Sequence, residues 1–209
     1  MKIAGIIIAI LLLVWIGWSY FGTRNIERPT ITSVNQLSGG VIEIKVASMI
    51  QASVIATWSQ SDAIQNGFRQ LAGYIFGDNK TKQPVAMTAP VAIEKSNTTI
   101  AMTAPVAAQQ QWDKYRVSFM MPSKYTLSTL PESTNNNISF EQIPAKEYYV
   151  RKFGGYANEA RAQKQLAAFL DALQAQNISV SSEPILNQYN DPRTMPLMRK
   201  NEWRIEKTY

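Results

Sequence analysis

Few side chains in this sequence could serve in catalysis, and the two most versatile ones are absent. The 209 residues include no histidine and no cysteine, which excludes Ser-His-Asp triads, cysteine nucleophiles, disulfides and metal sites built on imidazole or thiolate. Any catalysis would therefore rest on carboxylates, lysine, tyrosine or serine, and the candidate carboxylate pairs are Glu141 with Glu147 and Glu202 with Glu206. On strands, these spacings are equally expected of surface charges. We predict that the protein is not an enzyme.

Methionine, which can ligate metals and fill apolar clefts, occurs in a phrase that the chain contains twice. Residues 85–91 read Val-Ala-Met-Thr-Ala-Pro-Val, and residues 100–106 read Ile-Ala-Met-Thr-Ala-Pro-Val. One repetition is too little for a repeat architecture, which needs at least three units of ~20 residues. Each copy has a β-prone run closed by a proline that cannot donate to a ladder. The pattern predicts a hairpin with two similar arms.

Hydrophobic periodicity predicts the elements that surround this hairpin. One amphipathic helix ends at Gly77 and carries an apolar stripe with Phe68 and Leu71, and a second helix spans about residues 158–176. The predicted strands are residues 41–46, 52–58, 115–121, 138–143, 147–153, 184–189 and 202–207. Their order predicts an antiparallel α+β fold of two pseudo-symmetric βαββ-like halves, whose helices pack against one side of a curved sheet or partial barrel.

The N-terminus carries an apolar segment without a formal charge, residues 3–21. As a helix it would be ~28 Å long, about the thickness of one hydrocarbon core. Trp15, Trp18 and Tyr20 near its end match an aromatic belt. We predict an uncleaved transmembrane helix as an anchor over residues 1–22, with a cleaved signal peptide or a buried helix as the alternatives. A slight excess of positive charge before the segment favours a domain on the exported, periplasmic side.

The composition predicts one globular domain of ordinary size. Of all residues, 45% are hydrophobic and 17% are charged, which is enough for a core without covalent staples. Residues 23–37 would tether this domain, residues 38–209, to the anchor. The net charge of +6 comes from 21 basic and 15 acidic residues that are spread along the chain. We therefore expect no nucleic-acid partner.

Several short phrases, in their order along the chain, resemble one protein family. They are residues 68–79, both Met-Thr-Ala-Pro-Val copies, Met121-Pro-Ser-Lys-Tyr-Thr-Leu, Ile143-Pro-Ala, Phe153-Gly-Gly-Tyr, Tyr189-Asn-Asp-Pro and Arg199-Lys-Asn-Glu-Trp203. Together they resemble the SOUL haem-binding proteins over residues 41–207. The resemblance implies a distorted eight-stranded antiparallel barrel of two pseudo-symmetric halves with two flanking helices. The N-terminal segment is not part of the family pattern and would make this a membrane-anchored, bacterial-type member.

The resemblance implies non-covalent binding of haem or a related tetrapyrrole in an apolar cleft, for carriage, buffering or sensing. The cleft would lie between the first helix of the domain and the loop that joins the last two strands. Carried over to matching positions, its lining would be Phe68, Leu71, Ala72, Ile75, Phe76, Met87, Tyr189, Met195, Pro196, Leu197, Met198 and Arg199. A flat apolar plate with two carboxylates suits such a slot.

Cations near the predicted cleft would pair with the two carboxylates of haem, since arginine can bind a carboxylate through two parallel hydrogen bonds. The candidates are Arg69, Arg193, Arg199 and Lys200. Some family members are assigned an axial histidine, and this chain has none. Iron would then be held by methionine, tyrosine or lysine, with Tyr189 and Met87 as candidates, or by no protein ligand. The metal ligand therefore stays open.

Ordinary packing explains several of these residues as well. An amphipathic helix buries its apolar stripe in any case, which accounts for Phe68, Leu71 and Ile75. Met195 and Met198 flank a proline in a loop, where binding and packing explain them equally. The alternative function is a module of the same fold that binds another hydrophobic ligand or a protein partner at the membrane, because a fold alone does not decide function.

Overall fold

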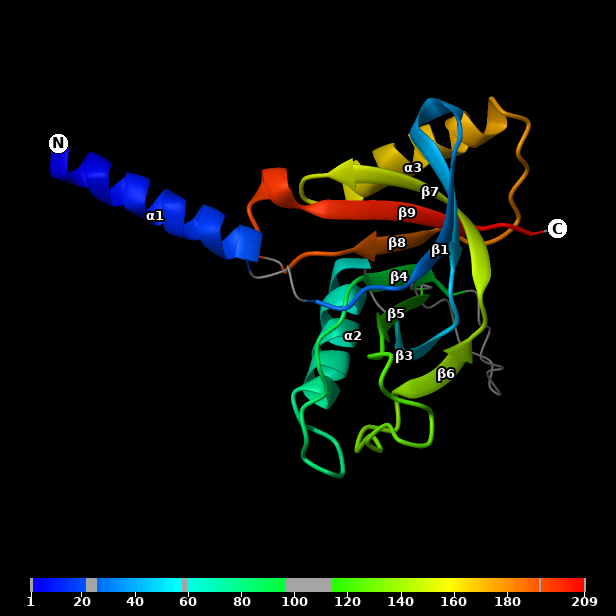
Figure 1. Cartoon of the computed structure of the whole chain (residues 1–209), viewed down its shortest axis with the longest axis horizontal. Helices are drawn as coiled ribbons and strands as arrows, with labels where there is room; N and C mark the ends of the chain where they lie inside the picture. Colours follow the sequence, from blue (N-terminus) through cyan, green and yellow to red (C-terminus); the bar gives the residue numbers. More distant parts are fainter. Residues whose placement is uncertain (1, 22–25, 58–59, 97–113, 192, 209) are drawn as a thin grey trace, which may run out of the picture.

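The described part of the chain forms one strongly curled antiparallel sheet of nine strands (Figure 1). The computed structural model describes residues 2–21, 26–57, 60–96, 114–191 and 193–208. The strands are β1 (Ile31–Gln36), β2 (Val41–Val46), β3 (Met49–Thr57), β4 (Val91–Lys95), β5 (Lys114–Met120), β6 (Ser139–Ile143), β7 (Lys146–Gly154), β8 (Ile185–Gln188) and β9 (Lys200–Glu206). The helices are α1 (Lys2–Phe21), α2 (Gln60–Ile75) and α3 (Glu159–Gln174), with short 3-10 turns η1 (Ser38–Gly40) and η2 (Pro196–Met198).

Two similar halves form the sheet, and the first strand of each half pairs with a strand of the other half. The first half runs β2-β3-α2-β4-β5 and the second runs β6-β7-α3-β8-β9. Strand β2 pairs with β7 of the second half, β6 pairs with β3 of the first, and β4 joins β8 at the centre. The predicted pseudo-symmetric α+β architecture is confirmed, and each half has the element order ββαββ. The sheet is a half-barrel rather than a closed barrel, because β1 and β6 are edges of the sheet that the described residues form.

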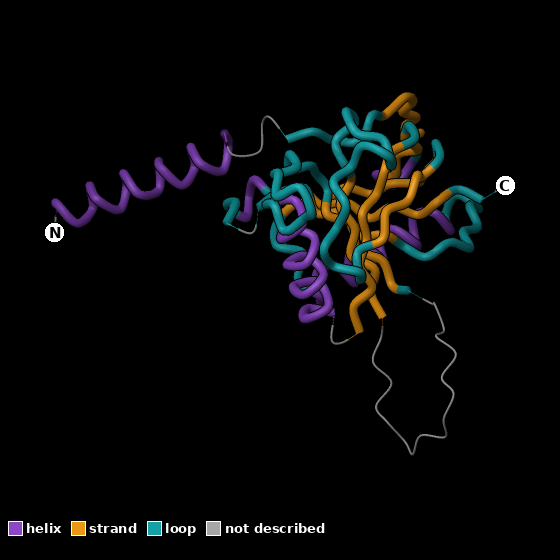
Figure 2. The backbone as a smooth tube through the Cα atoms, turned by 90° about the horizontal axis from the view of Figure 1, so that it is seen from below, coloured by secondary structure: helices purple, strands orange, loops and turns teal. Residues whose placement is uncertain are grey.

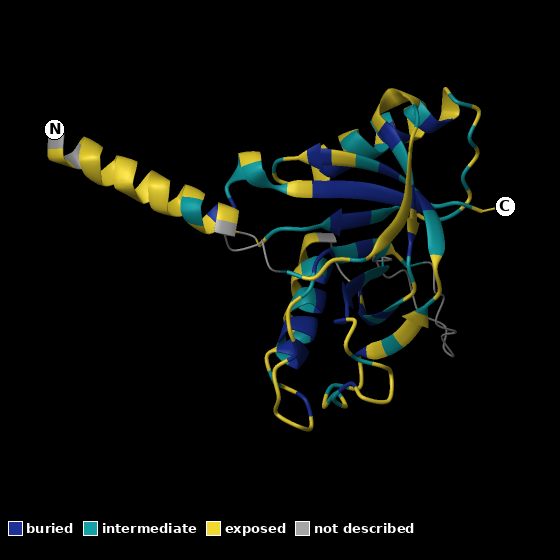
Figure 3. Cartoon of the chain, viewed as in Figure 1, coloured by how far each residue is buried: buried dark blue, intermediate teal, exposed yellow. Residues whose placement is uncertain are grey.

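Helices α2 and α3 cover one face of the sheet and enclose most of the core (Figure 3). Under α2, Leu71 and Ile75 pack with Val117 of β5. Under α3, Trp203 of β9 is buried, and its indole N–H donates a hydrogen bond to the carbonyl oxygen of Ala162 at 2.9 Å. The two predicted amphipathic helices are thus confirmed, and most of each apolar stripe is buried or half-buried, although Leu170 of α3 is 38% exposed.

The tether predicted for residues 23–37 is wrong in part, because residues 31–36 form strand β1. Their backbone pairs with β2, while all six side chains are exposed. A strand without a buried face leaves no alternating hydrophobic pattern, which is the pattern that reveals strands in a sequence.

The first copy of the repeated phrase is not the strand arm that the hairpin prediction requires. The backbone N–H of Val85 donates to the carbonyl oxygen of Ile75 at 2.8 Å, and that of Ala89 donates to Glu27 at 2.9 Å. These bonds hold the segment against α2 and the chain before β1, so the strand β4 begins only at Val91. The second copy of the phrase lies outside the described residues.

Helix α1 projects away from the sheet (Figures 1 and 2). Most of its large apolar side chains are exposed, among them Leu11 at 63% and Leu13 at 67%. Within the described residues, no helix has the length and apolar character needed to cross a membrane. The predicted transmembrane anchor therefore has no support in the structure.

Gly67 allows α2 to approach β5 closely. A Cβ atom at this position would lie 2.7 Å from the Cβ of Val117, well inside the separation at which carbon atoms attract one another. We expect Gly67→Ala to destabilise the domain by about 1–3 kcal/mol, because overpacking outweighs the gain in helix propensity. Urea unfolding followed by circular dichroism measures the change.

The matched control is Gly73→Ala in the same helix. Its Cβ would meet only the side chain of Asp78, whose carboxylate can move aside at the surface, so we expect no loss of stability. Equal unfolding midpoints for the two variants would contradict the close approach of α2 and β5.

Candidate functional site

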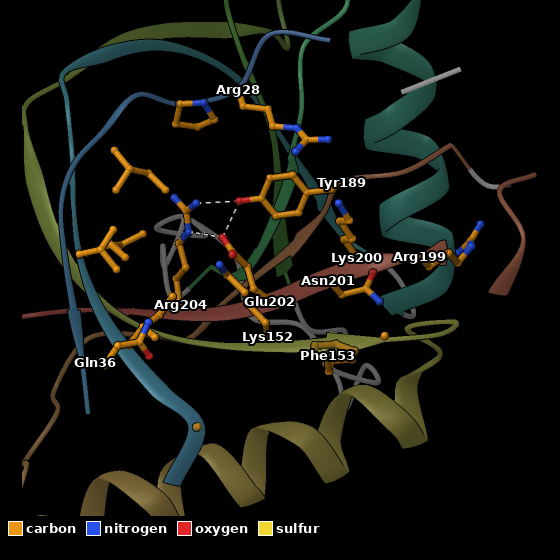
Figure 4. A pocket seen from close by; sticks show the side chains of 17 residues that line it. Arg28, Gln36, Lys152, Phe153, Tyr189, Arg199, Lys200, Asn201, Glu202 and Arg204 are labelled. Atoms are coloured by element: carbon orange, nitrogen blue, oxygen red, sulfur yellow. Dashed lines mark hydrogen bonds and ion pairs between the residues drawn. The ribbon is translucent and has the colours of Figure 1, made fainter. Parts of the chain in front are cut away.

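A pocket of about 880 Å³, the main pocket, lies on the face of the sheet that α2 and α3 do not cover (Figure 4). Successive residues of a strand point to opposite faces. Trp203 and Ile205 of β9 pack under α3, so Glu202 and Arg204 point to the other side and line the main pocket. The segment before β1, together with β1, β2, β7 and β9, provides most of its walls.

One wall of the main pocket is apolar and comes from β1 and β2. Val34 is paired with Ile44, and Gln36 with Ile42, and side chains paired across an antiparallel ladder share a face. Ile31 extends this wall at the start of β1. Strand β7 separates β2 from β9 in the sheet, so the curl of the sheet is what brings the apolar wall opposite the β9 side chains.

The other side of the main pocket is rich in cations. Arg28, Lys152 and Lys200 line it, and none of the three forms an ion pair with another residue in the described part of the chain. The guanidinium of Arg28 lies over the ring of Tyr189, 5.7 Å from the ring centroid. The pocket therefore favours a ligand with an apolar body and negative charge at its edge.

A buried network joins Tyr189, Glu202 and Arg204 at the inner side of the main pocket (Figure 4). The Tyr189 hydroxyl donates to Oε1 of Glu202 at 2.6 Å, and Arg204 donates from Nε to the same oxygen at 2.5 Å and from Nη2 to the Tyr189 oxygen at 2.8 Å. Glu202 and Arg204 are each only 4% exposed. Buried charges require such pairing, because an uncompensated charge in the interior is costly.

The network holds Tyr189 and Arg204 each in one protonation state. Burial raises the pKa of the Tyr189 phenol above its usual range, and the adjacent Glu202 carboxylate adds to this effect against the opposing effect of Arg204. Burial disfavours the charge on Arg204, but Glu202 and Tyr189 outweigh it, so the pKa of Arg204 is raised. Tyr189 is thus a neutral hydrogen-bond donor beside a neutralised ion pair.

Arg199, which also lines the main pocket, holds the loop between β8 and β9. Its Nε donates to the carbonyl oxygen of Thr194 and its Nη2 to that of Asp191, both at 3.1 Å. Its guanidinium also lies 4.3 Å from the ring centroid of Tyr156, a cation–π distance. These contacts give Arg199 a structural role in the loop.

Comparison with known protein families finds one family model that matches almost the entire domain. The family model described as SOUL heme-binding protein matches residues 26–206. This chain belongs to the SOUL haem-binding protein family. The family model includes β1, which the sequence predicts as part of a tether.

Two curated relatives and one solved structure show how far the SOUL likeness extends. Heme-binding protein 1 of Xenopus laevis is 30% identical over 146 residues, which cover 69% of this chain and 72% of that protein. Heme-binding protein 2 of Mus musculus is 28% identical over 150 residues, which cover 69% and 67%. The crystal structure of the EcmrR C-terminal domain has a TM-score of 0.56 at 9% identity and covers 79% of this chain and 95% of that chain. This last likeness concerns the fold alone.

In this SOUL family member, the helical side of the predicted cleft is mostly core. Leu71, Ala72 and Ile75 are buried between α2 and the sheet. Phe68 is half-buried, and its ring packs edge-on against Phe119 with centroids 5.4 Å apart. These side chains lie on the covered face of the sheet, whereas the main pocket lies on the other face.

Three further residues of the predicted cleft are at the surface. Phe76 is 70% exposed, Met87 is 41% exposed and Leu197 is 92% exposed. Phe76 and Arg69 line a separate hollow of about 700 Å³ beside the end of α2. The structure does not bring this group together with the main pocket.

The loop residues divide between two spaces. Tyr189, Arg199 and Lys200 line the main pocket, while Met198 lines a smaller neighbouring hollow, also with Lys200. Met195 and Pro196 are half-buried, and Arg193 is exposed. The structure thus places the loop, but not the α2 stripe, at the main pocket.

The sequence contains a signal for the buried ion pair. In β9, Glu202 and Arg204 are two residues apart, and Trp203 and Ile205 alternate with them. A strand with large apolar residues on one face and opposite charges on the other indicates a polar pocket as readily as a solvated face. The wall from β1 and β2 has no comparable signal, because it depends on pairings between strands that are far apart in the sequence.

Removing Arg204 alone should cost much more stability than removing the network. We expect Arg204→Met to destabilise the domain by about 3–5 kcal/mol, because it leaves the Glu202 carboxylate buried without a partner. The triple variant Tyr189→Phe, Glu202→Leu and Arg204→Met leaves no orphaned charge, and we expect it to be more stable than Arg204→Met by about 2 kcal/mol or more. Urea unfolding followed by Trp fluorescence tests both, and equal losses would argue that the charges are solvated.

Proposed function

We propose that this protein binds haem or a related tetrapyrrole without a covalent bond, in the main pocket. The observation that carries the proposal is the pairing of an apolar wall with a cationic side in one pocket of a SOUL family member. A tetrapyrrole of this kind has an apolar plate and two carboxylates. Carriage, buffering and sensing are the roles that such binding would serve.

The shape and charge of the main pocket suit this class of ligand. Its volume of about 880 Å³ falls in the range of small-molecule sites, roughly 300–1,000 Å³. The plate would lie against Ile42 and Ile44, and the carboxylates would face Arg28 and Lys200. Charge-assisted hydrogen bonds from such cations are about twice as strong as neutral ones, so the two cations would orient the plate in the pocket.

The residues near the main pocket favour binding through the plate and the carboxylates over a strong bond to iron. The chain has no histidine or cysteine. Tyrosine binds iron as a phenolate, and burial together with Glu202 raises the pKa of the Tyr189 phenol and keeps its proton in place. The absence of an imidazole ligand is therefore compatible with the proposed site, where Tyr189 would be a neutral wall residue whose hydroxyl proton is held by Glu202.

A second candidate function is a binding module for another hydrophobic ligand or for a protein partner. The pocket chemistry would accept other amphipathic anions, since its apolar wall and its cations do not distinguish a tetrapyrrole from a smaller apolar acid. We propose no catalytic role for either ligand.

Titration of the purified full-length protein with haemin tests the proposal. We expect a saturating Soret change with one equivalent bound at micromolar or tighter affinity. Arg28→Glu and Lys200→Glu should each weaken binding by about tenfold or more, because each removes a charge-assisted contact and adds a repulsive charge.

Phe76→Asp is the matched control, because it places a negative charge at the predicted cleft beside α2 and outside the main pocket. We expect its affinity to stay within about twofold of the wild type. If Phe76→Asp abolishes binding while Arg28→Glu does not, the ligand lies beside α2. A featureless, non-saturating rise in absorbance with the wild type would contradict the proposal that the protein binds haem.

We further propose that α1 associates the protein with a membrane, with the domain on the exported side. The support is the apolar surface of α1, whose side chains Ile8, Leu11 and Leu13 are 58%, 63% and 67% exposed. A contiguous apolar surface of this kind is typical of a site that interacts with a membrane or with another protein. The slight excess of positive charge before the helix supports the orientation.

Cell fractionation checks the association. We expect the full-length protein to sediment with membranes, to resist washing with high salt, and to be released by detergent, because burial of apolar side chains is insensitive to salt screening. The variant with Leu11→Asp and Leu13→Asp should shift mostly to the supernatant. Release of the wild-type protein by salt alone would contradict the proposal.

A further inference from the structure

The last turns of α1 contact the loop between β8 and β9. Nε1 of Trp15 donates a hydrogen bond to the carbonyl oxygen of Arg193 at 2.8 Å, and the Ser19 hydroxyl oxygen accepts one from the backbone N–H of Met195 at 3.0 Å. Ser19 is only 4% exposed, in contrast to most of α1. These contacts fix the end of the helix against the loop.

A hollow of about 430 Å³, the α1 hollow, lies between these two elements. Ser19 and Tyr20 contribute to it from α1, and Met198 contributes to it from the loop. Arg28 and Lys200 line both the α1 hollow and the main pocket. The two spaces therefore meet at this pair of cations.

The helix surface next to the α1 hollow is apolar. Tyr20, which lines the hollow, is 49% exposed, and Ile16, one turn before it on the same side of the helix, is 41% exposed. A ligand that left the main pocket by this side would pass Arg28 and Lys200 and would then reach an apolar surface rather than open water. This order of contacts suits an anion with an apolar body.

We propose that the α1 hollow is the opening through which the main pocket exchanges its tetrapyrrole with a lipid bilayer. This inference rests on the proposed binding function and adds a route and a donor to it. Lipid fits as the partner because the exposed apolar side of α1 begins at the opening. The plate stays in apolar surroundings along this route, and the two cations can pair with the carboxylates during the passage.

Filling the α1 hollow tests the route. Full-length protein is incorporated into phosphatidylcholine vesicles, which are mixed with phosphatidylcholine vesicles that carry haemin, and the Soret shift reports transfer. We expect Met198→Trp to slow the transfer about tenfold while the equilibrium affinity stays within about twofold of the wild type, because a blocked opening changes rates and not the bound state. Leu197→Trp is the matched control, since Leu197 is 92% exposed in the same turn, and it should leave the rate unchanged.

A second variant keeps the test valid if Met198→Trp misfolds. Tyr20→Ala widens the α1 hollow from the helix side and should accelerate transfer without changing the affinity. Wild-type rates in the folded variants, or a loss of affinity in Met198→Trp as large as its loss of rate, would overturn the route. If the wild type binds no haemin at equilibrium, the proposed function itself fails. If only the route is wrong, the wild type still binds haemin, and both variants transfer it at the wild-type rate.

Discussion

The exchange of first strands between the two halves is the constraint on which the rest of the structure depends. Because β2 belongs to the first half and pairs with β7 of the second, and β6 does the reverse, neither half can complete its sheet alone. The exchange makes one continuous sheet out of two units, and the right-handed twist of strands accumulates across it into a curl. Helices α2 and α3 lie on one face of the curled sheet. The other face is concave, with β1 along its rim.

Polar side chains on the concave face pair with one another, and the same face forms the main pocket. Glu202 and Arg204 neutralise each other, and the register places Asn187 of β8 opposite Glu202. The amide nitrogen of Asn187 is buried and has no hydrogen-bond partner within the described residues. Because a buried donor without an acceptor costs about 1–3 kcal/mol, this position would gain from an oxygen supplied by water or by a ligand. Stability and binding capacity are thus in competition on this face.

Local patterns predicted most of the elements, although not β1 or β4, whereas the walls of the main pocket depend on pairings between distant strands. The stripe with Leu71 and Ile75 predicted α2 correctly, because a helix that packs on a sheet must bury one side. The binding prediction used the same stripe, but its side chains are buried between α2 and the sheet and belong to the core. Val34 and Ile44 form a pocket wall only because β1 pairs with β2, and no local pattern encodes that pairing. Tyr189 and Lys200 were placed at the pocket by the family resemblance, not by periodicity.

The cations around the main pocket differ in what they can offer a ligand. Arg204 is held by Glu202 and Tyr189, and Arg199 is held by two loop carbonyl oxygens and by Tyr156, so moving either toward a ligand would break contacts that the fold uses. Arg28 and Lys200 have no such ion pairs within the described residues, and both border the α1 hollow as well. A carboxylate would therefore gain most at this pair. The two cations that attract the charge of the ligand also lie where the main pocket meets the α1 hollow, so recognition and exchange would share the same two side chains.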